Sequence, residues 1–272
     1  MNVKLIAHTA LSDEFVSELT SMEWDEGGPS YSVPYDNERA AVALTAIRTC
    51  YSALKPADIL ATEGRKYFGQ SASDGEGGAE SDRLFRHIIR SKHTSTLEHI
   101  TYTFAIEGVS RSLLAQLTRH RIGFSFSVQS QRYVKFGSGD KSAGFDYVTP
   151  VSVDGRDVPG TNRYDDVALS IRHDPLKAYE VYEDAMIAAQ KAYDALRAAG
   201  VPAEDARYVL PNAAACNIVM TANLRALIEF YDKRRPGNGA QAEIAELAEK
   251  IREEVTKVDA WAVGFFNVKE TV

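Results

Sequence analysis

The spacing of apolar residues predicts strands and helices that alternate along the chain without an internal repeat. The run HITYTFAIEG, residues 99–108, is apolar at every second position, which is the pattern of a half-buried strand that ends at Gly108. Shorter strands are predicted at VKLIAH, residues 3–8, and at AACNIVMTAN, residues 214–223. The chain therefore contains at least three strands separated by longer helical segments.

Helical spacing of apolar residues is strongest in the second half of the chain. The predicted helices cover residues 37–54, 81–93, 109–120, 173–200, 224–235 and 240–258. The residues expected to cap their amino ends are Ser81 or Asp82, Ser110, Asp174 and Asn223. Pro175 and Gly200 are expected to bound the long helix at its two ends. Gln116, Arg119 and His120 fall in the last turns of the helix at 109–120.

These elements predict an α+β fold with a mixed or antiparallel twisted sheet packed with several long helices. No shift in composition marks a boundary, so residues 1–272 are expected to form one domain. The segment GQSASDGEGGAESD, residues 69–82, offers almost nothing to bury. It is predicted to be a mobile surface loop.

Composition and charge narrow the possible functions. With 272 residues and 44% hydrophobic residues the chain can bury a substantial core. Its net charge of −7 argues against general binding of nucleic acids or membrane surfaces, so a local basic cluster indicates a small anion instead. Cys50 and Cys216 lack metal-site spacing, so buried structural thiols and no metal are expected. The absence of a leader or apolar span in the sequence predicts a cytoplasmic protein.

The candidate chemistry is concentrated in LTRHRIGFSFSVQSQRYVKF, residues 117–136. Arginine keeps its proton at neutral pH, so Arg119 and Arg121 can bind phosphate or carboxylate groups, or stabilise developing negative charge. Ser130 and Arg132 are one residue apart, and in an extended segment both would face the same side and could share one phosphate. The pattern thus predicts an anion site.

Aromatic residues interleave with this basic cluster, namely Phe124, Phe126 and Tyr133. They could stack on a planar ring or could belong to the core. An RNA-binding module that stacks bases on these rings is one alternative function. The acidic balance of the chain counts against it.

Several short segments of the chain resemble the motifs of one protein family and occur in the same order. RHR at 119–121 followed by SQRY at 130–133 resembles the motif of the flavin-dependent thymidylate synthases, which is RHR with a downstream Ser-x-Arg. Four further segments are similar to that family in the same order. They are HTSTLEH at 93–99, GVSRSLLAQLTRHR at 108–121, ARYVLPN at 206–212 and TANLRALIEFYDKRR at 221–235. The resemblance covers most of residues 87–235.

The resemblance implies a homotetrameric α+β enzyme that holds flavin adenine dinucleotide (FAD) and methylates deoxyuridine monophosphate (dUMP). Methylenetetrahydrofolate would donate the carbon and NADPH would reduce the flavin. Such an enzyme needs no cysteine nucleophile. A flavin- or nucleotide-binding protein without catalysis is the alternative within the same resemblance.

Site residues follow by position in the matched segments. Those implied to contact the flavin are His93, Ser95, Arg119, His120, Arg121, Gln129, Asn223 and Arg225. Those implied to hold dUMP are Gln116, Arg119, Gln129, Ser130, Gln131, Arg132, Arg207 and Arg234. Arg234 is the implied catalytic residue, because a permanent cation there would stabilise negative charge on the pyrimidine ring.

The chain departs from the family pattern in two places. Eight residues separate Arg121 from Ser130 where seven are commoner, and Gly123 is expected to absorb the extra residue in a tight turn. The same shift puts Val128 where relatives have Gln or Glu, so Gln129 is expected to take over that contact. Glu229 stands where relatives carry His or Asn, and a carboxylate close to a phosphate would be repulsive.

Overall fold

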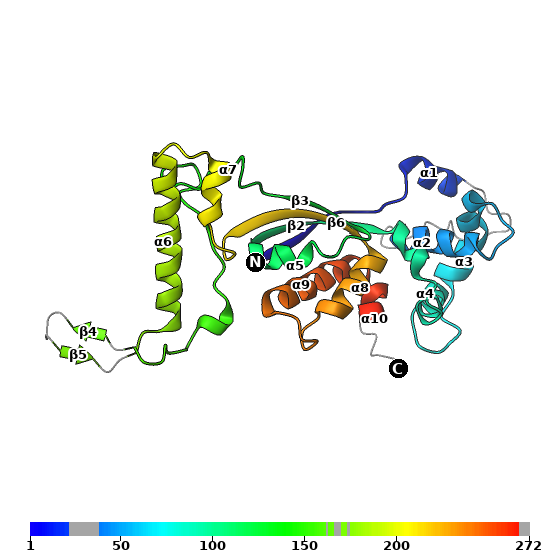
Figure 1. The fold of residues 1–272 in the computed structure, drawn as a ribbon. Helices are drawn as coiled ribbons and strands as arrows, with labels where there is room; N and C mark the ends of the chain where they lie inside the picture. The colour runs from blue at the N-terminus through cyan, green and yellow to red at the C-terminus, as the bar shows by residue number, and fades with distance from the viewer. Residues whose placement is uncertain (22–37, 162, 166–169, 173–174, 267–272) are drawn as a thin grey trace.

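A four-stranded antiparallel sheet forms the centre of the protein, seen in a computed structural model (Figure 1). The described residues are 1–21, 38–161, 163–165, 170–172 and 175–266. The strand order is β1-β2-β6-β3, with β1 at Asn2–His8, β2 at Thr101–Ser110, β3 at Phe124–Val128 and β6 at Ala215–Asn223. The predicted α+β class with an antiparallel sheet is confirmed.

Helices of very different length surround this sheet. They are α1 (Asp13–Ser21), α2 (Glu38–Thr49), α3 (Ile59–Gly69), α4 (Glu80–Arg90), α5 (Arg111–Leu117), α6 (Ala178–Ala198), α7 (Ala203–Ala206), α8 (Leu224–Arg234), α9 (Ala242–Val258) and α10 (Val263–Phe266). A short 3-10 helix, η3 (Thr94–His99), precedes β2, and a small hairpin pairs β4 (Arg163–Asp165) with β5 (Ser170–Arg172).

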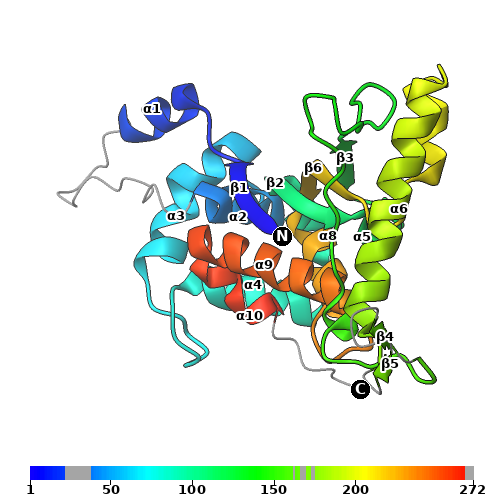
Figure 2. The ribbon, with the colours of Figure 1, turned by 90° about the vertical axis from the view of Figure 1, so that its left-hand side faces the viewer.

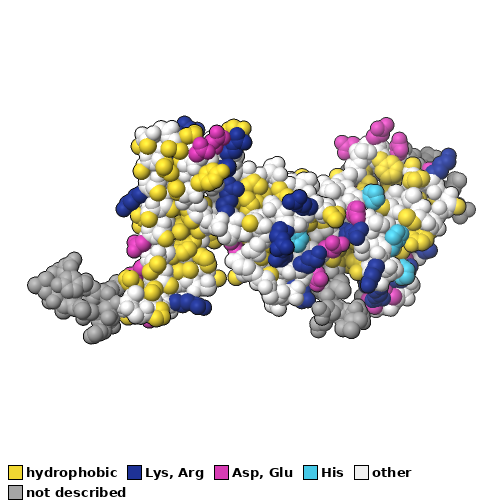
Figure 3. Space-filling model, in the orientation of Figure 1, with side chains coloured by type: hydrophobic (Ala, Val, Ile, Leu, Met, Phe, Trp, Pro, Cys, Tyr) yellow, Lys and Arg dark blue, Asp and Glu magenta, His cyan; other side chains and the backbone are white. Residues whose placement is uncertain are grey.

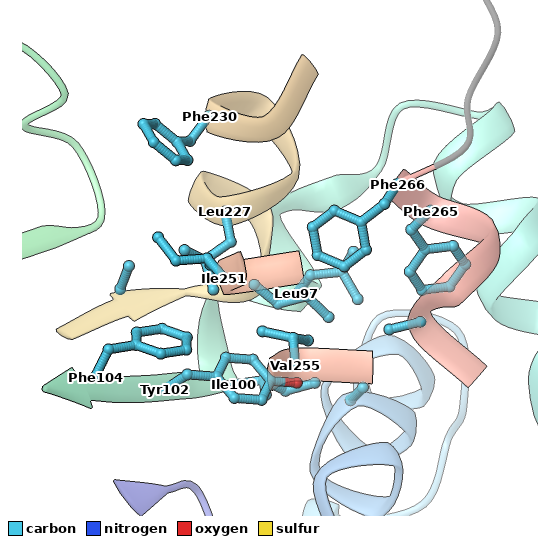
Figure 4. Close-up of a cluster of buried hydrophobic side chains, with 14 of the residues drawn as sticks. Leu97, Ile100, Tyr102, Phe104, Leu227, Phe230, Ile251, Val255, Phe265 and Phe266 are labelled. Atoms are coloured by element: carbon cyan, nitrogen blue, oxygen red, sulfur yellow. The ribbon is translucent and has the colours of Figure 1, made fainter. Parts of the chain in front are cut away.

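The main core lies between one face of the sheet and the helices α5, α8, α9 and α10, and it continues among the helices α2, α3 and α4 (Figures 1 and 4). In β2, the side chains of Tyr102, Phe104 and Ile106 are fully buried while the residues between them are partly exposed, as the alternation predicted. From α8, Leu227 and Phe230 pack into the same core. Because α8 is fixed by this packing, the polar residues on its other side are held in defined positions.

A second, smaller cluster of buried side chains lies at one end of the sheet, where α6 and α7 stand (Figures 1 and 2). Its members are Phe136, Phe145, Met186, Tyr193, Ala206 and Ala214. The cluster joins α6 and α7 to the segment that follows β3. The helices α1 to α4 lie at the opposite end of the sheet.

Two predicted amino-terminal caps are wrong. Helix α4 begins at Glu80 with Ala79 as its cap residue, and Asp82 accepts the Ala79 amide proton at 2.7 Å from inside the first turn. Helix α6 begins at Ala178 with Lys177 as its cap residue, and Asp174 lies outside the described residues. The predicted cap at Ser110 is confirmed, since its hydroxyl accepts the Leu113 amide proton. In α4 the carboxylate of Asp82, at the third helical position, accepts the free amide proton of the cap residue. The prediction failed because it placed the capping side chain immediately before the helix.

Gly108 bends β2 but does not end it. Its φ of +65° is in the left-handed region, and the pairing with β6 shifts register between Ile106 and Val109. The strand continues to Ser110, so the predicted end was wrong by two residues. The bulge turns Ser110 toward the start of α5.

The helix α5 is shorter than predicted. Its carboxyl-terminal cap is Thr118, whose amide and hydroxyl both donate to the Leu114 carbonyl oxygen. The His120 amide then bonds to the Leu117 carbonyl in a tighter turn. Consequently Gln116 lies in the last helical turn, whereas Arg119 and His120 lie beyond it.

The Gly- and Ser-rich loop is bounded by α3 and α4, so it spans residues 70–79 and not 69–82. Three ion pairs attach it to α4: Arg86 binds Asp74 at 2.7 Å and Glu76 at 3.3 Å, and Arg90 binds Glu76 at 2.8 Å. The acidic residues of the loop therefore complement basic residues near the end of that helix. Its mobility stays a prediction.

Candidate functional site

The Arg-His-Arg segment occupies the connection between α5 and β3. Arg119 and Arg121 are exposed, and within the part of the chain that the structure describes neither is paired with a carboxylate. Lys and Arg side chains gather over this part of the sheet and α5 in Figure 3. Two exposed guanidinium groups without carboxylate partners in this described segment are suited to bind an anion, in a chain of net charge −7.

Gly123 makes the tight turn that leads from this segment into β3. Its φ is +75°, and a Cβ atom added there would lie 2.6 Å from Nδ2 of Asn223 and 2.7 Å from Cβ of Ala226. The backbone therefore passes directly against the first turn of α8, where only glycine fits. The prediction that Gly123 forms a tight turn is confirmed.

His120 is partly buried, unlike its two exposed arginine neighbours. Its ring lies 5.0 Å from the ring of Phe230 and 5.9 Å from that of Phe124, between centroids. Its Nε2 atom accepts a hydrogen bond of 3.2 Å from Nε of Arg234 at the end of α8. The contact joins the Arg-His-Arg segment to the arginine implied to be catalytic.

The surroundings of His120 favour its neutral form. Burial of the ring lowers the pKa of His120 below its ordinary value, and the positive charges of Arg234, Lys233 and Arg119 lower it further. A neutral ring that accepts at Nε2 has its proton on Nδ1. The imidazole is thus an acceptor for Arg234 at neutral pH.

The amino end of α8 and the helix η3 form the other side of this region. Asn223 caps α8 through its Oδ1 atom, which accepts the Ala226 amide proton at 2.8 Å. Arg225 forms ion pairs with Glu98 of η3 at 2.6 Å and with Glu229 at 3.1 Å. The ion pair with Arg225 partly neutralises the negative charge of Glu229, which reduces the repulsion expected between this carboxylate and a phosphate.

Two residues of the predicted flavin set lie in η3. His93 is the cap residue of that helix, and its Nδ1 lies 3.0 Å from the hydroxyl of Tyr51. Ser95 is exposed in the first turn. Since Glu98 of the same helix binds Arg225, the structure brings His93, Ser95 and Arg225 to one region.

The Ser-x-Arg motif has a different conformation from the one predicted. The β3 ladder ends with the Gln129 amide bonded to the Asn217 carbonyl at 2.9 Å. Ser130 then starts a turn, with its carbonyl oxygen accepting from the Val134 amide and its hydroxyl from the Arg132 amide at 3.2 Å. The extended segment was therefore wrong, because the serine satisfies the backbone of a turn.

A pair of arginines faces one glutamate beside this turn. Arg132 forms an ion pair with the Glu204 carboxylate at 3.1 Å, and Nε of Arg207 donates to the Glu204 carbonyl oxygen at 2.9 Å. Each guanidinium also lies against a neighbouring aromatic ring, that of Tyr133 or Tyr208. Both rings are 81% exposed, so this is an open, basic and aromatic surface.

The predicted site residues thus fall into two groups within one chain. The first group surrounds the start of β3 and α8, where Phe124 pairs with Ala222. The second follows the end of β3, where Val128 pairs with Ile218. Four residue steps along an extended strand separate these ends by roughly 13 Å. Gln129 and Gln131 belong to the second group, and Gln116 belongs to α5.

The two cysteines have different surroundings. Cys216 is buried in the main core, and burial raises the pKa of its thiol. Cys50 is exposed at the end of α2, which contradicts the predicted burial of both thiols. Among the described residues there is no cluster of three or more His, Cys, Asp or Glu side chains suited to a metal ion. None of the helices in the described part of the chain has the length and apolarity to cross a membrane.

Comparisons with known proteins identify the family of the chain. Residues 33–259 match the family of thymidylate synthase complementing proteins. The chain is 42% identical over 195 residues to the flavin-dependent thymidylate synthase of Geobacter sulfurreducens, covering 72% of this chain and 68% of that one. It is 40% identical over 184 residues to the enzyme of the same name from Haloarcula marismortui, covering 66% and 73%.

Solved structures share the fold. A UMP/dUMP methylase, PolB from Streptomyces cacaoi, bound with 5-Br dUMP, has a TM-score of 0.60 at 22% identity and covers 99% of this chain and 97% of that one. The flavin-dependent thymidylate synthase ThyX of Helicobacter pylori, complexed with FAD and dUMP, has a TM-score of 0.59 at 20% identity, covering 98% of both chains. The family model and the sequence identities of about 40% define the class of this protein. It belongs to the family of flavin-dependent thymidylate synthases.

The sequence-based prediction missed the partners of the site arginines. Glu98 and Glu204 each bind an arginine of the site, and Phe230 packs against His120. The Glu204 carboxylate pairs with Arg132, which is 72 positions away in the sequence, so no local spacing indicated that contact. Glu98 and Phe230 lie in the matched segments, but their contacts with Arg225 and His120 join residues far apart in the sequence.

Proposed function

We propose that this chain is a thymidylate synthase that converts dUMP to dTMP, with FAD as cofactor, methylenetetrahydrofolate as carbon donor and NADPH as reductant. The observation that carries the proposal is the contact between the Arg-His-Arg segment and Arg234 in a member of this family. That contact brings a charge-binding loop and a permanent cation to one site.

The residues of the first group fit a flavin nucleotide. FAD carries two phosphate charges, and Arg119 and Arg121 offer two exposed guanidinium groups without carboxylate partners in the described part of the chain. His93, Ser95, Asn223 and Arg225 lie on the adjoining ends of η3 and α8. Reduced flavin supplies the hydride in this chemistry. The chain's own part is to bind and orient it.

The residues of the second group fit the phosphate of dUMP. Arg132 and Arg207 converge on Glu204, whose carboxylate and carbonyl oxygens occupy donors that a phosphate would use. A dianionic phosphate attracts these guanidinium groups more strongly than a single exposed carboxylate does. Ser130, together with Gln129 and Gln131, lines the same turn. Gln116 and Arg119 lie with the first group, toward which the uracil ring would point.

Arg234 is the residue that we propose to be catalytic. Its Nε atom is bonded to His120, and its terminal amino groups are left to bind negative charge that develops on the pyrimidine. No thiol is required in this scheme, in agreement with the burial of Cys216.

We also propose that the active enzyme is a homotetramer and that it acts in the cytoplasm, where its soluble substrates are found. Arg119, Arg121 and Arg132 of one chain are all exposed, so the proposed site is open toward a neighbouring copy that would cover it. A fully active monomer in light scattering would contradict this assembly.

Visible absorption of the purified protein and titration with dUMP together test the proposed function. We expect a bound flavin spectrum and saturable dUMP binding, followed by dTMP when methylenetetrahydrofolate and NADPH are added. Flavin and dUMP binding without any dTMP would instead define a binding protein that lacks catalysis. RNA binding without flavin would favour an RNA-binding module.

A further inference from the structure

The hydrogen bond between His120 and Arg234 uses one particular edge of the guanidinium group. Arg234 donates through Nε, the atom nearest its own backbone, to Nε2 of the imidazole. An arginine has five N–H donors in a rigid plane, and Nε provides only one of them. The four donors on the two terminal nitrogens remain on the far edge.

The imidazole that accepts this bond is itself held on several sides. The edge of its ring meets the ring of Phe230, which is 1% exposed, at an interplanar angle of 87°. The ring of Phe124 lies on another side and stacks in turn on Phe126, at an interplanar angle of 9°. Since Phe230 belongs to the main core and Phe124 to β3, the imidazole packs against two rings that the fold holds in place.

The helix that carries Arg234 ends at that residue, where a long side chain is normally free to move. Arg234 is the last residue of α8, and Arg235 is already the cap residue. A side chain at a helix end has many rotamers, and ordering it has an entropic cost. The bond from His120 selects one orientation before any ligand binds.

We infer that His120 is a positioning residue for Arg234, and that its neutral Nε2 aims the terminal amino groups of the guanidinium at the substrate. The inference rests on the proposed function for the role of Arg234. The bond itself is a property of the protein alone and can be measured without any ligand.

A dependence on pH follows from the groups that face His120. They are Arg234 and Lys233 from α8 and Arg119 from the connection after α5, and all three are cations. Protonation of the imidazole removes the lone pair that accepts the bond and places a like charge beside Arg234. The pKa of His120 is below its ordinary value, so the contact is intact at neutral pH and is lost as the pH falls through that lowered pKa.

The first test follows His120 by NMR in protein with isotope-labelled histidine and no ligands. The chain has six histidines, and the His120→Gln spectrum assigns the signal. In Arg234→Ala we expect the pKa of His120 to rise, because one of the cations that lower it is gone. Arg235→Ala is the matched control, since it removes the adjacent arginine of the same helix end. An unchanged His120 pKa in Arg234→Ala, or equal shifts in both variants, would overturn the contact.

The second test compares His120→Gln with His120→Ala in steady-state kinetics, with flavin content measured first. The glutamine amide oxygen can accept from Arg234 but cannot be protonated in this range. We expect His120→Ala to lower kcat by at least about tenfold, the value of a hydrogen bond to a charged group, with a smaller change in KM for dUMP. His120→Gln should keep more of kcat and lose the fall in rate at acidic pH.

The kinetic and NMR results together distinguish failure of the positioning role of His120 from failure of the proposed function. A flavin-loaded His120→Ala enzyme with normal kcat would refute the positioning role, as would a His120→Gln enzyme with an unchanged acid limb. If the NMR result is as expected but the wild-type protein forms no dTMP, the proposed function fails and the contact stands. Arg234→Ala should lower kcat at saturating dUMP, since added substrate cannot replace the lost charge.

Discussion

Replacement of Gly123 by alanine probes the turn on which the whole first group of site residues depends. Its φ of +75° is unfavourable for any residue with a side chain, and the new Cβ would lie 2.6 Å from Nδ2 of Asn223. Asn223 caps α8, and the same helix carries Arg234 at its other end. We therefore expect the change to reduce both stability and activity.

The loss of stability in Gly123→Ala has two causes, which are the left-handed backbone and the close approach to Asn223. Gly155 serves as a control that has only the first. That glycine also has a positive φ, +68°, but nothing lies within 4 Å of an added Cβ. Gly155→Ala should lower the free energy of unfolding by about 1–2 kcal/mol, the cost of the left-handed conformation alone. Gly123→Ala adds overpacking of about 1–3 kcal/mol, so its total is about 2–5 kcal/mol.

Urea unfolding followed by circular dichroism measures both variants, at one protomer concentration because subunit association also contributes to stability. We expect Gly123→Ala to be clearly the less stable and to bind less flavin, while Gly155→Ala binds flavin normally. Equal losses of stability in the two variants would refute the argument from the close approach to Asn223.

The remaining predictions concern substrate, cysteines and the unusual glutamate. Ser130→Ala should reduce activity without abolishing it, costing about 1–3 kcal/mol of hydrogen bonding, and Arg132→Ala should mainly raise KM for dUMP in steady-state kinetics. A dead Ser130→Ala enzyme that still binds dUMP would contradict the binding role. Replacing Cys50 and Cys216 together by alanine should leave turnover largely intact; loss of turnover in a folded, flavin-loaded protein would count against the thiol-free scheme. Glu229→Gln frees Arg225 from one of its two carboxylates, so flavin should bind more tightly by equilibrium titration, and weaker binding would show that Glu229 has another role.

The alternating and helical patterns predicted most of the fold because burial on one side of an element leaves a period in the sequence. The strand β2 and the cap at Asn223 were predicted from such local signals and are confirmed. The end of β2 was misplaced because a glycine can bulge a strand as well as end it. The cap of α4 was misplaced because a carboxylate inside the helix serves that role.

The site was predicted as a set of residues but not as an arrangement. Motif order indicated Arg119, Ser130 and Arg234, whereas the roughly 13 Å between the two groups depends on the strand β3, which was not among the predicted strands. The bond from Arg234 to His120 joins residues 114 positions apart in sequence, so no local pattern contains it. Contacts of this kind arise from tertiary packing, and they decide how the motif residues act together.

A single turnover of the purified protein under anaerobic conditions tests whether this chain forms dTMP with hydride from its flavin. The bound flavin is reduced beforehand, and dUMP with methylenetetrahydrofolate is then added without NADPH. We expect dTMP in an amount equal to the reduced flavin, together with return of the oxidised flavin spectrum. Reduced flavin that persists while dUMP is bound and no dTMP forms would contradict this expectation.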